Sequence, residues 1–286
     1  FAYNKQTAGN NFFQQESSDP DITSKAVEEF DALADILLRN DVDVTLVQDT
    51  PDPWTPDSIF PNNWFSSHLS GELVLYPMFA ENRRTERKPE ALRVLRREMN
   101  HTKIIDLTHW EAKQEFLEGT GSMVFDRDKK VAYCSRSART SEKVIQDFCS
   151  KMNFDAVMFN AVDKEDNPLY HTNIMMSIGV QAAVICLQSI KDDSERQKVV
   201  SRLQSSGKVI VDITQDQMNQ FAGNMLELKS RNGNPLMVMS SSARKSLTFQ
   251  QEKVIGTYTK IISSDLSTIE HVGGGSARCM IAEIFA

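Results

Sequence analysis

The chain has 286 residues, of which 40% are hydrophobic and 25% charged, a composition typical of a globular protein with a sizeable buried core. Its net charge is −7 and no stretch gathers five basic residues, so we expect no nucleic-acid partner and no anionic membrane surface as partner. No apolar run reaches the roughly 18 residues that a membrane-spanning helix requires. These properties favour an enzyme or binding protein that acts on a small molecule.

The four cysteines, at positions 134, 149, 186 and 279, have spacings that fit neither a metal motif nor a disulfide framework. We therefore expect no metal and no organic cofactor, and a reducing compartment, the cytoplasm, as the site of action. The chain begins at Phe1 rather than at a methionine, which leaves a preceding targeting signal open.

One arrangement of predicted elements recurs along the chain: two apolar segments joined by a turn, then a helix, then a short strand. The predicted helices, in chain order, are Thr23–Asn40, Arg87–Met99, Ser141–Met152, Asp193–Ser205 and Ala243–Thr259. The predicted short strands that follow them are Val42–Val47, Lys103–Leu107, Ala156–Phe159, Lys208–Ile213 and Ile261–Ser264. The paired segments are Ser58–Phe65 with Glu72–Met78, Glu118–Asp126 with Lys130–Ser135, His171–Ile178 with Ala182–Leu187, Gly223–Lys229 with Pro235–Ser240, and Thr268–Val272 with Ala277–Phe285.

The register of these units brings reactive residues to matching positions. Glu118, His171, Asn224 and Cys279 each lie near one end of a paired segment, about 53 to 55 residues apart. In a cyclic repeat, matching positions lie around a common axis, so these side chains are expected to converge. Four residues can also share a spacing by accident. The pattern predicts an α/β protein built as one domain, residues 1–286.

Cys279 is the first candidate for catalysis. It ends the run Gly273-Gly274-Gly275-Ser276-Ala277-Arg278-Cys279, in which glycines allow the backbone to approach a ligand closely. The neighbouring Arg278 is a group that favours a thiolate. The alternative is a buried structural cysteine, and we assign that role to the other three cysteines, which lie in apolar runs or on a predicted helix.

His171 and Glu118 are the candidate acid/base pair. His171 begins a predicted strand with Asn173 two residues later, so both side chains are predicted to point to one side. Glu118 precedes Gly119 and Gly121 at the start of another apolar strand, which suits a carboxylate aimed into a pocket. The ordinary alternatives are an edge histidine and an exposed turn glutamate.

Two further clusters are candidates for substrate binding. The stretch from Thr55 to Trp64 contains Asp57, Asn62 and Asn63, a carboxylate and two amides beside an indole. Arg139, in Ser137-Ala138-Arg139-Thr140, could hold a carboxylate, because a guanidinium pairs with a carboxylate through two parallel hydrogen bonds.

Together these residues resemble the guanidino-group-modifying, or pentein, superfamily of arginine deiminases, dimethylarginine dimethylaminohydrolases and amidinotransferases. The resemblance runs from Gln6-Thr7-Ala8-Gly9-Asn10-Asn11 to the final glycine run and looks closest to amidinotransferase-like citrulline-utilisation hydrolases. It implies a five-bladed α/β propeller of ββαβ units. It also implies Cys279 as nucleophile, His171 as acid/base, Glu118 as assisting carboxylate and Arg139 as a clamp for the substrate α-carboxylate, with Arg83 or Arg84 as further candidates.

The sequence departs from the arginine deiminase pattern at two aspartates that hold the guanidinium. Where those enzymes have His-x-Asp and Arg-Asp-Pro, this chain has His171-x-Asn173 and Asn62-Asn63-Trp64, and Gly121 stands where a further acid is usual. A cationic guanidinium is best held by carboxylates, whereas Asn offers a donor and an acceptor without charge. The change favours a neutral ureido group, held by Asp57 and Asn63, and hence citrulline as substrate.

We therefore predict hydrolysis of citrulline to ornithine, ammonia and carbon dioxide through a covalent Cys279 adduct. Arginine deimination, amidino transfer to an amine, and a catalytically silent amino-acid-binding relative remain as alternatives. The expected partner is a free amino acid, and the sequence leaves a homo-oligomer open.

Overall fold

The computed structural model describes residues 1–98 and 103–285, and its framework is four three-stranded sheets of the same design. In each sheet the first two strands are antiparallel and the third runs parallel to the second. The strands are β1 Phe65–Ser67, β2 Glu72–Leu75, β3 Lys103–Asp106, β4 Met123–Asp126, β5 Val131–Ser135, β6 Asp155–Phe159, β7 Met176–Ile178, β8 Ala182–Ile185, β9 Val209–Asp212, β10 Leu226–Lys229, β11 Pro235–Ser240 and β12 Lys260–Ser264.

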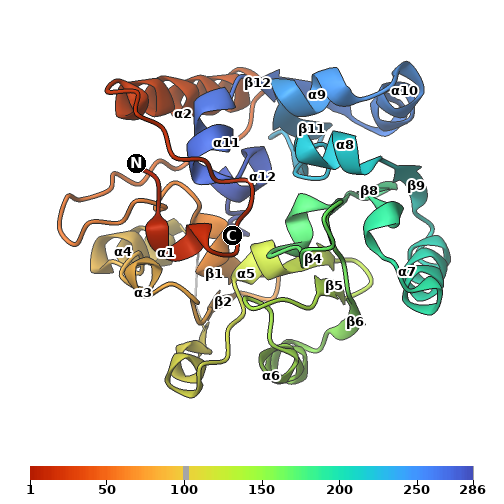
Figure 1. Cartoon of the computed structure of the whole chain (residues 1–286), viewed down its shortest axis with the longest axis horizontal. Helices are drawn as coiled ribbons and strands as arrows, with labels where there is room; N and C mark the ends of the chain where they lie inside the picture. The colour runs from red at the N-terminus through yellow and green to blue at the C-terminus, as the bar shows by residue number, and fades with distance from the viewer. Residues whose placement is uncertain (99–102, 286) are drawn as a thin grey trace.

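Helices connect the second and third strands of each sheet and lie on the outside of the molecule (Figure 1). They are α4 Pro89–Glu98, α6 Glu142–Met152, α7 Asp193–Ser205, and α9 Ser241–Ser246 with α10 Phe249–Tyr258. The predicted ββαβ unit is thus confirmed four times. The remaining elements are α1 Lys5–Ala8, α2 Ile22–Arg39, α3 Glu81–Arg84, α5 Gly119–Ser122, α8 Gln215–Asn219, α11 Ser267–Gly273, α12 Ala277–Met280, and the 3-10 helices η1 Pro61–Asn63, η2 Thr108–Lys113, η3 Thr172–Ile174 and η4 Leu187–Ser189.

Local sequence explains where the outer helices begin and which face they bury. Helix α6 buries Val144, Ile145, Phe148 and Met152, which lie three or four residues apart and so share one face. The predicted helix 243–259 divides in two because Thr248 caps α10 in a capping box with Gln251. The predicted helix 87–99 begins later, at a proline suited to the first turn, and its expected last residue, Met99, lies outside the described residues.

The fifth predicted pair of strands is wrong. Residues 267–273 form helix α11 and residues 277–280 form α12, whereas paired strands were expected at 268–272 and 277–285. The apolar residues Ile269 and Val272 are both buried at helical spacing, and the carboxylate of Glu29 accepts hydrogen bonds from the first amides of α11. Within the described residues the predicted strand 42–47 has no strand assignment either. Helix α2, which precedes this segment, packs against β12.

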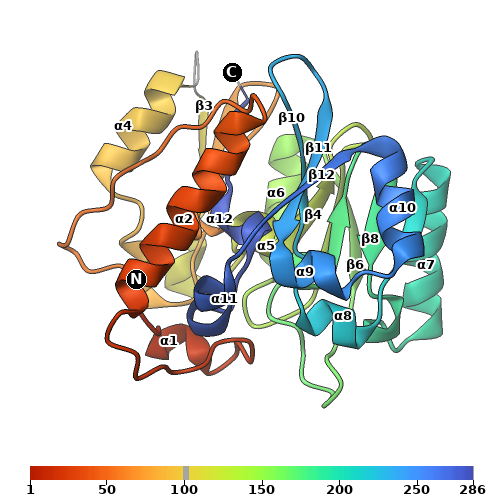
Figure 2. The ribbon, with the colours of Figure 1, turned by 90° about the horizontal axis from the view of Figure 1, so that it is seen from above.

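Four short turns meet at the centre of the molecule and carry the candidate residues. Helix α5 contacts η1 and η3, and α12 contacts η1. Glu118 and His171 hold the same place in their units, each five residues before the first strand, where Phe60 and Phe221 stand in the other two. Asn224 lies only two residues before β10, so the sequence spacing gave it the wrong register. Figure 2 shows α1 and α11 at one end of the molecule, with the C-terminus at the other.

Candidate active site

Cys279 is buried on α12, at 3% exposure, directly after the glycine turn. Gly274 adopts φ 63°, and a Cβ atom there would lie 2.6 Å from the side-chain nitrogen of Asn11. Only glycine combines this backbone conformation with such a close neighbour. The turn therefore fixes the thiol against the centre of the protein, as its sequence predicted.

His171 and Glu118 form a buried hydrogen-bonded pair. The His171 Nε2 atom lies 2.8 Å from Glu118 Oε2, and both residues are at most 2% exposed. The other Glu118 oxygen accepts from the backbone amide of Phe79 at 3.0 Å. A Cβ on Gly121 would lie 2.7 Å from the His171 ring, so the missing acid at position 121 leaves the space that the imidazole occupies. This pair can hold one ring nitrogen while the other exchanges protons.

The charges around this pair determine its protonation. Burial raises the pKa of Glu118, but the guanidinium of Arg139 and the hydrogen bond from His171 outweigh burial and hold that pKa well below its usual range. Burial, together with the charges of Arg139 and Arg83, lowers the pKa of His171 to about 4 against the opposing effect of Glu118. Glu118 is then ionised and the resting imidazole neutral, with its Nε2–H donated to the carboxylate and Nδ1 free to accept a proton.

Asp57, Asn63 and Arg83 also line the site. Arg83 Nη1 donates to Asn63 Oδ1 at 2.7 Å, and its other nitrogens donate to Glu86 and to the carbonyl of Phe60. A guanidinium only donates, so this contact fixes the orientation of the Asn63 amide. Burial raises the pKa of Asp57, although the nearby charge of Arg83 opposes it. Arg83 thus organises the site through buried partners.

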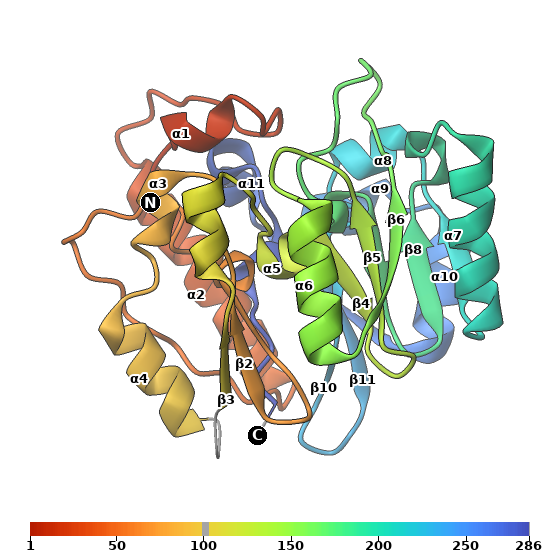
Figure 3. The same cartoon turned by 90° about the horizontal axis from the view of Figure 1, so that it is seen from below.

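Arg139 connects the site to the N-terminal segment. Its guanidinium lies 3.4 Å from Glu118 Oε2 and donates to the carbonyl of Thr7 and to Asn10 Oδ1. It also stacks over the Tyr170 ring, 4.8 Å from the centroid. Figure 3 shows α1, which contains Thr7, at the same end of the molecule as α11. A carboxylate that binds Arg139 would replace Asn10.

Arg84 and Asn173 make contacts that the sequence did not indicate, whereas Asn224 lies beside Cys279, as their shared spacing predicted. The guanidinium of Arg84 donates to the carbonyls of Met78 and Phe79 and lies 3.8 Å from Glu111, so it is bound to the α3 region. Asn173 Nδ2 lies 3.4 Å from Cys279 Sγ, where a contact with substrate was expected. Asn224, which sequence reasoning left unassigned, places its Nδ2 3.3 Å from the same sulfur. Only the approximate spacing of Asn224 indicated a place near Cys279.

A small cavity joins most of these residues. It is lined by Thr7, Asn11, Asp57, Phe60, Asn63, Arg83, Arg139, Tyr170, His171, Gly273, Gly274, Gly275 and Cys279. Two of its polar atoms, Asp57 Oδ1 and Asn63 Nδ2, have no hydrogen-bond partner among the described residues. One is an acceptor and the other a donor, so a ligand that carries both complements is favoured.

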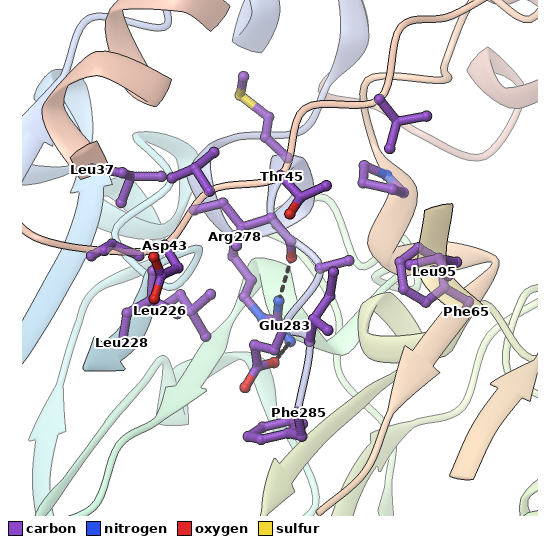
Figure 4. A pocket seen from close by; sticks show the side chains of 18 of the residues that line it. Leu37, Asp43, Thr45, Phe65, Leu95, Leu226, Leu228, Arg278, Glu283 and Phe285 are labelled. Atoms are coloured by element: carbon purple, nitrogen blue, oxygen red, sulfur yellow. Dashed lines mark hydrogen bonds and ion pairs between the residues drawn. The ribbon is translucent and has the colours of Figure 1, made fainter. Parts of the chain in front are cut away.

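A second, much larger cavity lies beyond α12, and Figure 4 shows it from close by. Arg278 and Met280 line it, on either side of Cys279 in the sequence. Most of the side chains that Figure 4 labels are apolar, among them Leu37, Phe65 and Leu226, and Arg278 is paired with Glu283 at 3.0 Å. The chemically reactive groups therefore lie in the smaller of the two cavities.

Comparison with known proteins identifies the family. A family model described as N,N dimethylarginine dimethylhydrolase, eukaryotic, matches residues 1–286. The chain belongs to this family. This match confirms the resemblance to guanidino-group-modifying enzymes that the sequence motifs indicated. Among curated protein sequences, none matches the chain significantly.

Solved structures of low sequence identity share the fold. ArgZ, an arginine dihydrolase from cyanobacteria, matches with a TM-score of 0.71 at 17% identity over 92% of this chain and 38% of its own. The N-terminal domain of ArgZ bound to product matches with a TM-score of 0.69 at 18% identity, over 90% and 85%. A dimethylarginine dimethylaminohydrolase adduct matches with a TM-score of 0.63 at 18% identity, over 91% and 92%. The chain spans less than half of full-length ArgZ.

Two searches of the described residues, 1–98 and 103–285, gave no candidate. None of their helices is long and apolar enough to cross a membrane. They also contain no group of three or more His, Cys, Asp or Glu side chains that could hold a metal ion.

Proposed function

We propose that the chain is a cysteine-dependent hydrolase of the ureido carbon of a free amino acid, citrulline, which it converts to ornithine, ammonia and carbon dioxide. The observation that carries this proposal is the pair of unpartnered atoms in the small cavity, the donor Asn63 Nδ2 and the acceptor Asp57 Oδ1. A ureido group has a carbonyl oxygen for the donor and N–H groups for the acceptor. A guanidinium has only donors, and it would leave Asn63 Nδ2 buried and unpaired.

Arginine is the second candidate, and a specific observation favours it. The family model is that of a dimethylarginine hydrolase, and ArgZ is an arginine dihydrolase. Asp57 and the ionised Glu118 also place two acidic groups near the reacting centre, as a cationic substrate requires. Glu118 is already paired with Arg139, however, so Asp57 is the carboxylate left to meet a guanidinium.

The proposed reaction begins with transfer of the Cys279 proton to His171, whose neutral imidazole is held by Glu118. The Cys279 thiolate then forms a bond to the ureido carbon, and the bond from that carbon to the side-chain nitrogen breaks. That nitrogen takes the proton from His171 and leaves as ornithine. His171 next removes a proton from water, which attacks the carbamoyl carbon on Cys279. The carbon–sulfur bond then breaks, and the sulfur takes the proton back from His171. The released carbamic acid divides into ammonia and carbon dioxide.

Binding of the amino-acid end is proposed for Arg139. Its guanidinium lines the small cavity and holds Asn10, a neutral partner that a substrate carboxylate would exchange for a charged one. A bond from a guanidinium to a carboxylate is about twice as strong as one to a neutral acceptor. The N-terminal segment would then shift when substrate binds.

The remaining proposals concern the whole chain. We propose that residues 1–286 form one catalytic domain of five propeller units, with α2, α11, α12 and the segments beside them as the irregular fifth unit. In Figure 1 these helices lie between the first and fourth sheets. The cytoplasm is the proposed compartment, because the four cysteines are free.

Product analysis tests the proposed function. Purified protein is incubated with citrulline, with arginine, and with arginine plus glycine, and the products are identified by mass. The proposal expects ornithine from citrulline, lost in Cys279→Ala and retained in the control Cys149→Ala. Citrulline from arginine would indicate deimination, amidino transfer to glycine would indicate a transferase, and no product from any mixture would indicate a silent relative.

A further inference from the structure

The sulfur of Cys279 has two side-chain amides beside it. Asn173 Nδ2 lies 3.4 Å and Asn224 Nδ2 lies 3.3 Å from Cys279 Sγ. Both asparagines are completely buried, and both come from turns that precede a first strand, Asn173 from η3 and Asn224 from the turn before β10. Two separate ββαβ units therefore direct a neutral N–H donor at the same atom.

The backbone contacts of Asn224 determine which end of its amide faces the sulfur. Its Oδ1 accepts from the backbone amide of Arg278 at 3.1 Å, and its Nδ2 donates to the carbonyl of Asn173 at 2.9 Å. Rotating the amide by half a turn would set oxygen against the carbonyl oxygen and N–H against N–H. The second hydrogen of Nδ2 is therefore free to point to Cys279.

Asn173 has no other use for its amide among the described residues. Its Oδ1 is buried without a partner, and its Nδ2 bonds to the sulfur. Burying an amide that makes only one hydrogen bond costs free energy of folding, and a strong hydrogen bond offsets more of that cost. A hydrogen bond to a charged acceptor is about twice as strong as one to a neutral acceptor. Because the amide is neutral, it can donate to the sulfur without adding a negative charge beside it.

The site also needs such donors. Cys279 is buried, the neutral His171 provides no positive charge for a thiolate, and the charge of Arg278 is paired with Glu283. A buried anion is stabilised by hydrogen bonds to its charged form. When the S–H bond breaks, the electron pair stays on sulfur and the proton passes to His171 or to water.

We propose that Asn173 and Asn224 form a two-amide cradle that stabilises the Cys279 thiolate, which makes both of them catalytic residues in contact with the reacting sulfur. This inference rests on Cys279 being the nucleophile of the proposed function. It assigns the Asn173 amide to the sulfur of Cys279, whereas the sequence had predicted that this amide contacts the substrate.

The test measures alkylation of Cys279 by iodoacetamide as a function of pH, without substrate, by peptide mass spectrometry. Asn173→Ala removes only the bond to sulfur. Asn62→Ala is its matched control, because Asn62 is the middle residue of η1 as Asn173 is of η3, is equally buried, and also has an unpartnered Oδ1, but donates to Thr120 instead. Asn224→Asp is the second variant, and near-ultraviolet circular dichroism checks the folding of all three.

The proposal expects the midpoint of the alkylation profile to rise by about one pH unit in Asn173→Ala and Asn224→Asp, with a fall of about tenfold in the rate at pH 7. Asn62→Ala should stay within about twofold of the wild type. A midpoint unchanged in folded Asn173→Ala would overturn the cradle. Because alkylation needs no substrate, a shifted midpoint in a protein that hydrolyses nothing would reject the proposed function and leave the cradle standing.

The kinetic readout separates the cradle from substrate binding. If Asn173 contacts the thiolate, Asn173→Ala should lower kcat about tenfold and change KM little, because the bond to sulfur is made with or without substrate. A change confined to KM would indicate that Asn173 binds the substrate rather than the sulfur, and would contradict the proposal.

Discussion

Two cavities lie on either side of α12, and they differ in size and in the chemistry of the residues that line them. Cys279 faces a small cavity whose lining contains Asp57, Arg139 and His171, whereas Arg278, one residue earlier, faces a large and mostly apolar one. Both cavities have unpaired buried polar atoms, among them Asp57 Oδ1 in the small one and Asp126 Oδ2 in the large one. Among the described residues, the lining of the large cavity contains no cysteine or histidine, whereas the small cavity has both. The difference teaches that size does not identify the reactive site. A candidate nucleophile and a candidate base in the same lining do.

The largest expected loss of activity follows from removing the Cys279 thiol of the small cavity. Cys279→Ala removes the nucleophile and should lower kcat at least about 1,000-fold, because no neighbouring group replaces a covalent intermediate. Cys186→Ala, in the core and far from α12 in sequence, should keep kcat within about threefold. Steady-state ornithine release measures both, and equal loss in the two variants would break the assignment of chemistry to the small cavity.

Removing the charge behind His171 should have the next largest effect. Glu118→Gln keeps the shape of the side chain but no longer stabilises the imidazolium that forms during the reaction, so kcat should fall about 100- to 10,000-fold. Glu115→Gln, a carboxylate paired with the surface Lys143, is the control and should change kcat little. A Glu118→Gln enzyme with wild-type kcat would show that His171 works alone.

Replacing the unpaired donor of Asn63 by an acceptor should show whether the site prefers citrulline or arginine. Asn63→Asp keeps the bond from Arg83 but replaces Nδ2, the proposed partner of the ureido oxygen. We expect kcat/KM for citrulline to fall about 10- to 100-fold, and that for arginine to rise relative to it. Both constants are measured on the same preparation. An unchanged ratio would remove Asn63 from substrate recognition.

A substitution in the large cavity should affect stability rather than chemistry. Glu283 accepts from Arg278 at 3.0 Å and from Arg127 at 3.1 Å, so Glu283→Gln leaves the buried Arg278 and the largely buried Arg127 without their counter-charge. The free energy of unfolding in urea should fall by about 1–3 kcal/mol, while kcat stays within about threefold at 25 °C. A loss of kcat without a loss of stability would mean that the two cavities are coupled.

The smallest expected effect is a dependence of stability on pH near the large cavity. Burial and the charge of Arg127 lower the pKa of His68 to about 4, below its value of about 6.5 in the unfolded chain. The unfolded chain then binds the extra proton as pH falls below about 6.5, so stability is lost from there down to about pH 4. The contribution is about 1 kcal/mol at pH 5.5. Urea unfolding of wild type and His68→Asn at pH 7 and 5.5 measures it, and parallel losses in the two proteins would exclude His68.

Much of this arrangement could be predicted from the sequence, and the failures have physical causes. Alternating and helical apolar patterns predicted the four ββαβ units, because each buries one face of its elements. The spacing of Glu118 and His171 was informative because both lie five residues before a strand. The fifth unit was predicted wrongly because two apolar residues, Ile269 and Val272, are a weak signal in so short a segment, and because the cap from Glu29 comes from far away in the sequence.

The roles of the asparagines could not be obtained from spacing alone. Whether the Asn173 side chain meets the substrate or the sulfur depends on its position relative to Cys279, which only the folded chain determines. Arg84 was a candidate because it is adjacent to Arg83, yet adjacent residues on a helix point in different directions. Motifs predicted which residues react, and tertiary contacts determine what each of them touches.

Competition between the two amino acids tests the central claim most directly. When the enzyme is given citrulline and arginine together at equal concentration, the ratio of their rates of consumption equals the ratio of their kcat/KM values. The pairing of Asn63 Nδ2 with a carbonyl oxygen predicts that citrulline disappears first and that ornithine accumulates with it. Faster consumption of arginine would contradict the account and assign the site to a guanidinium.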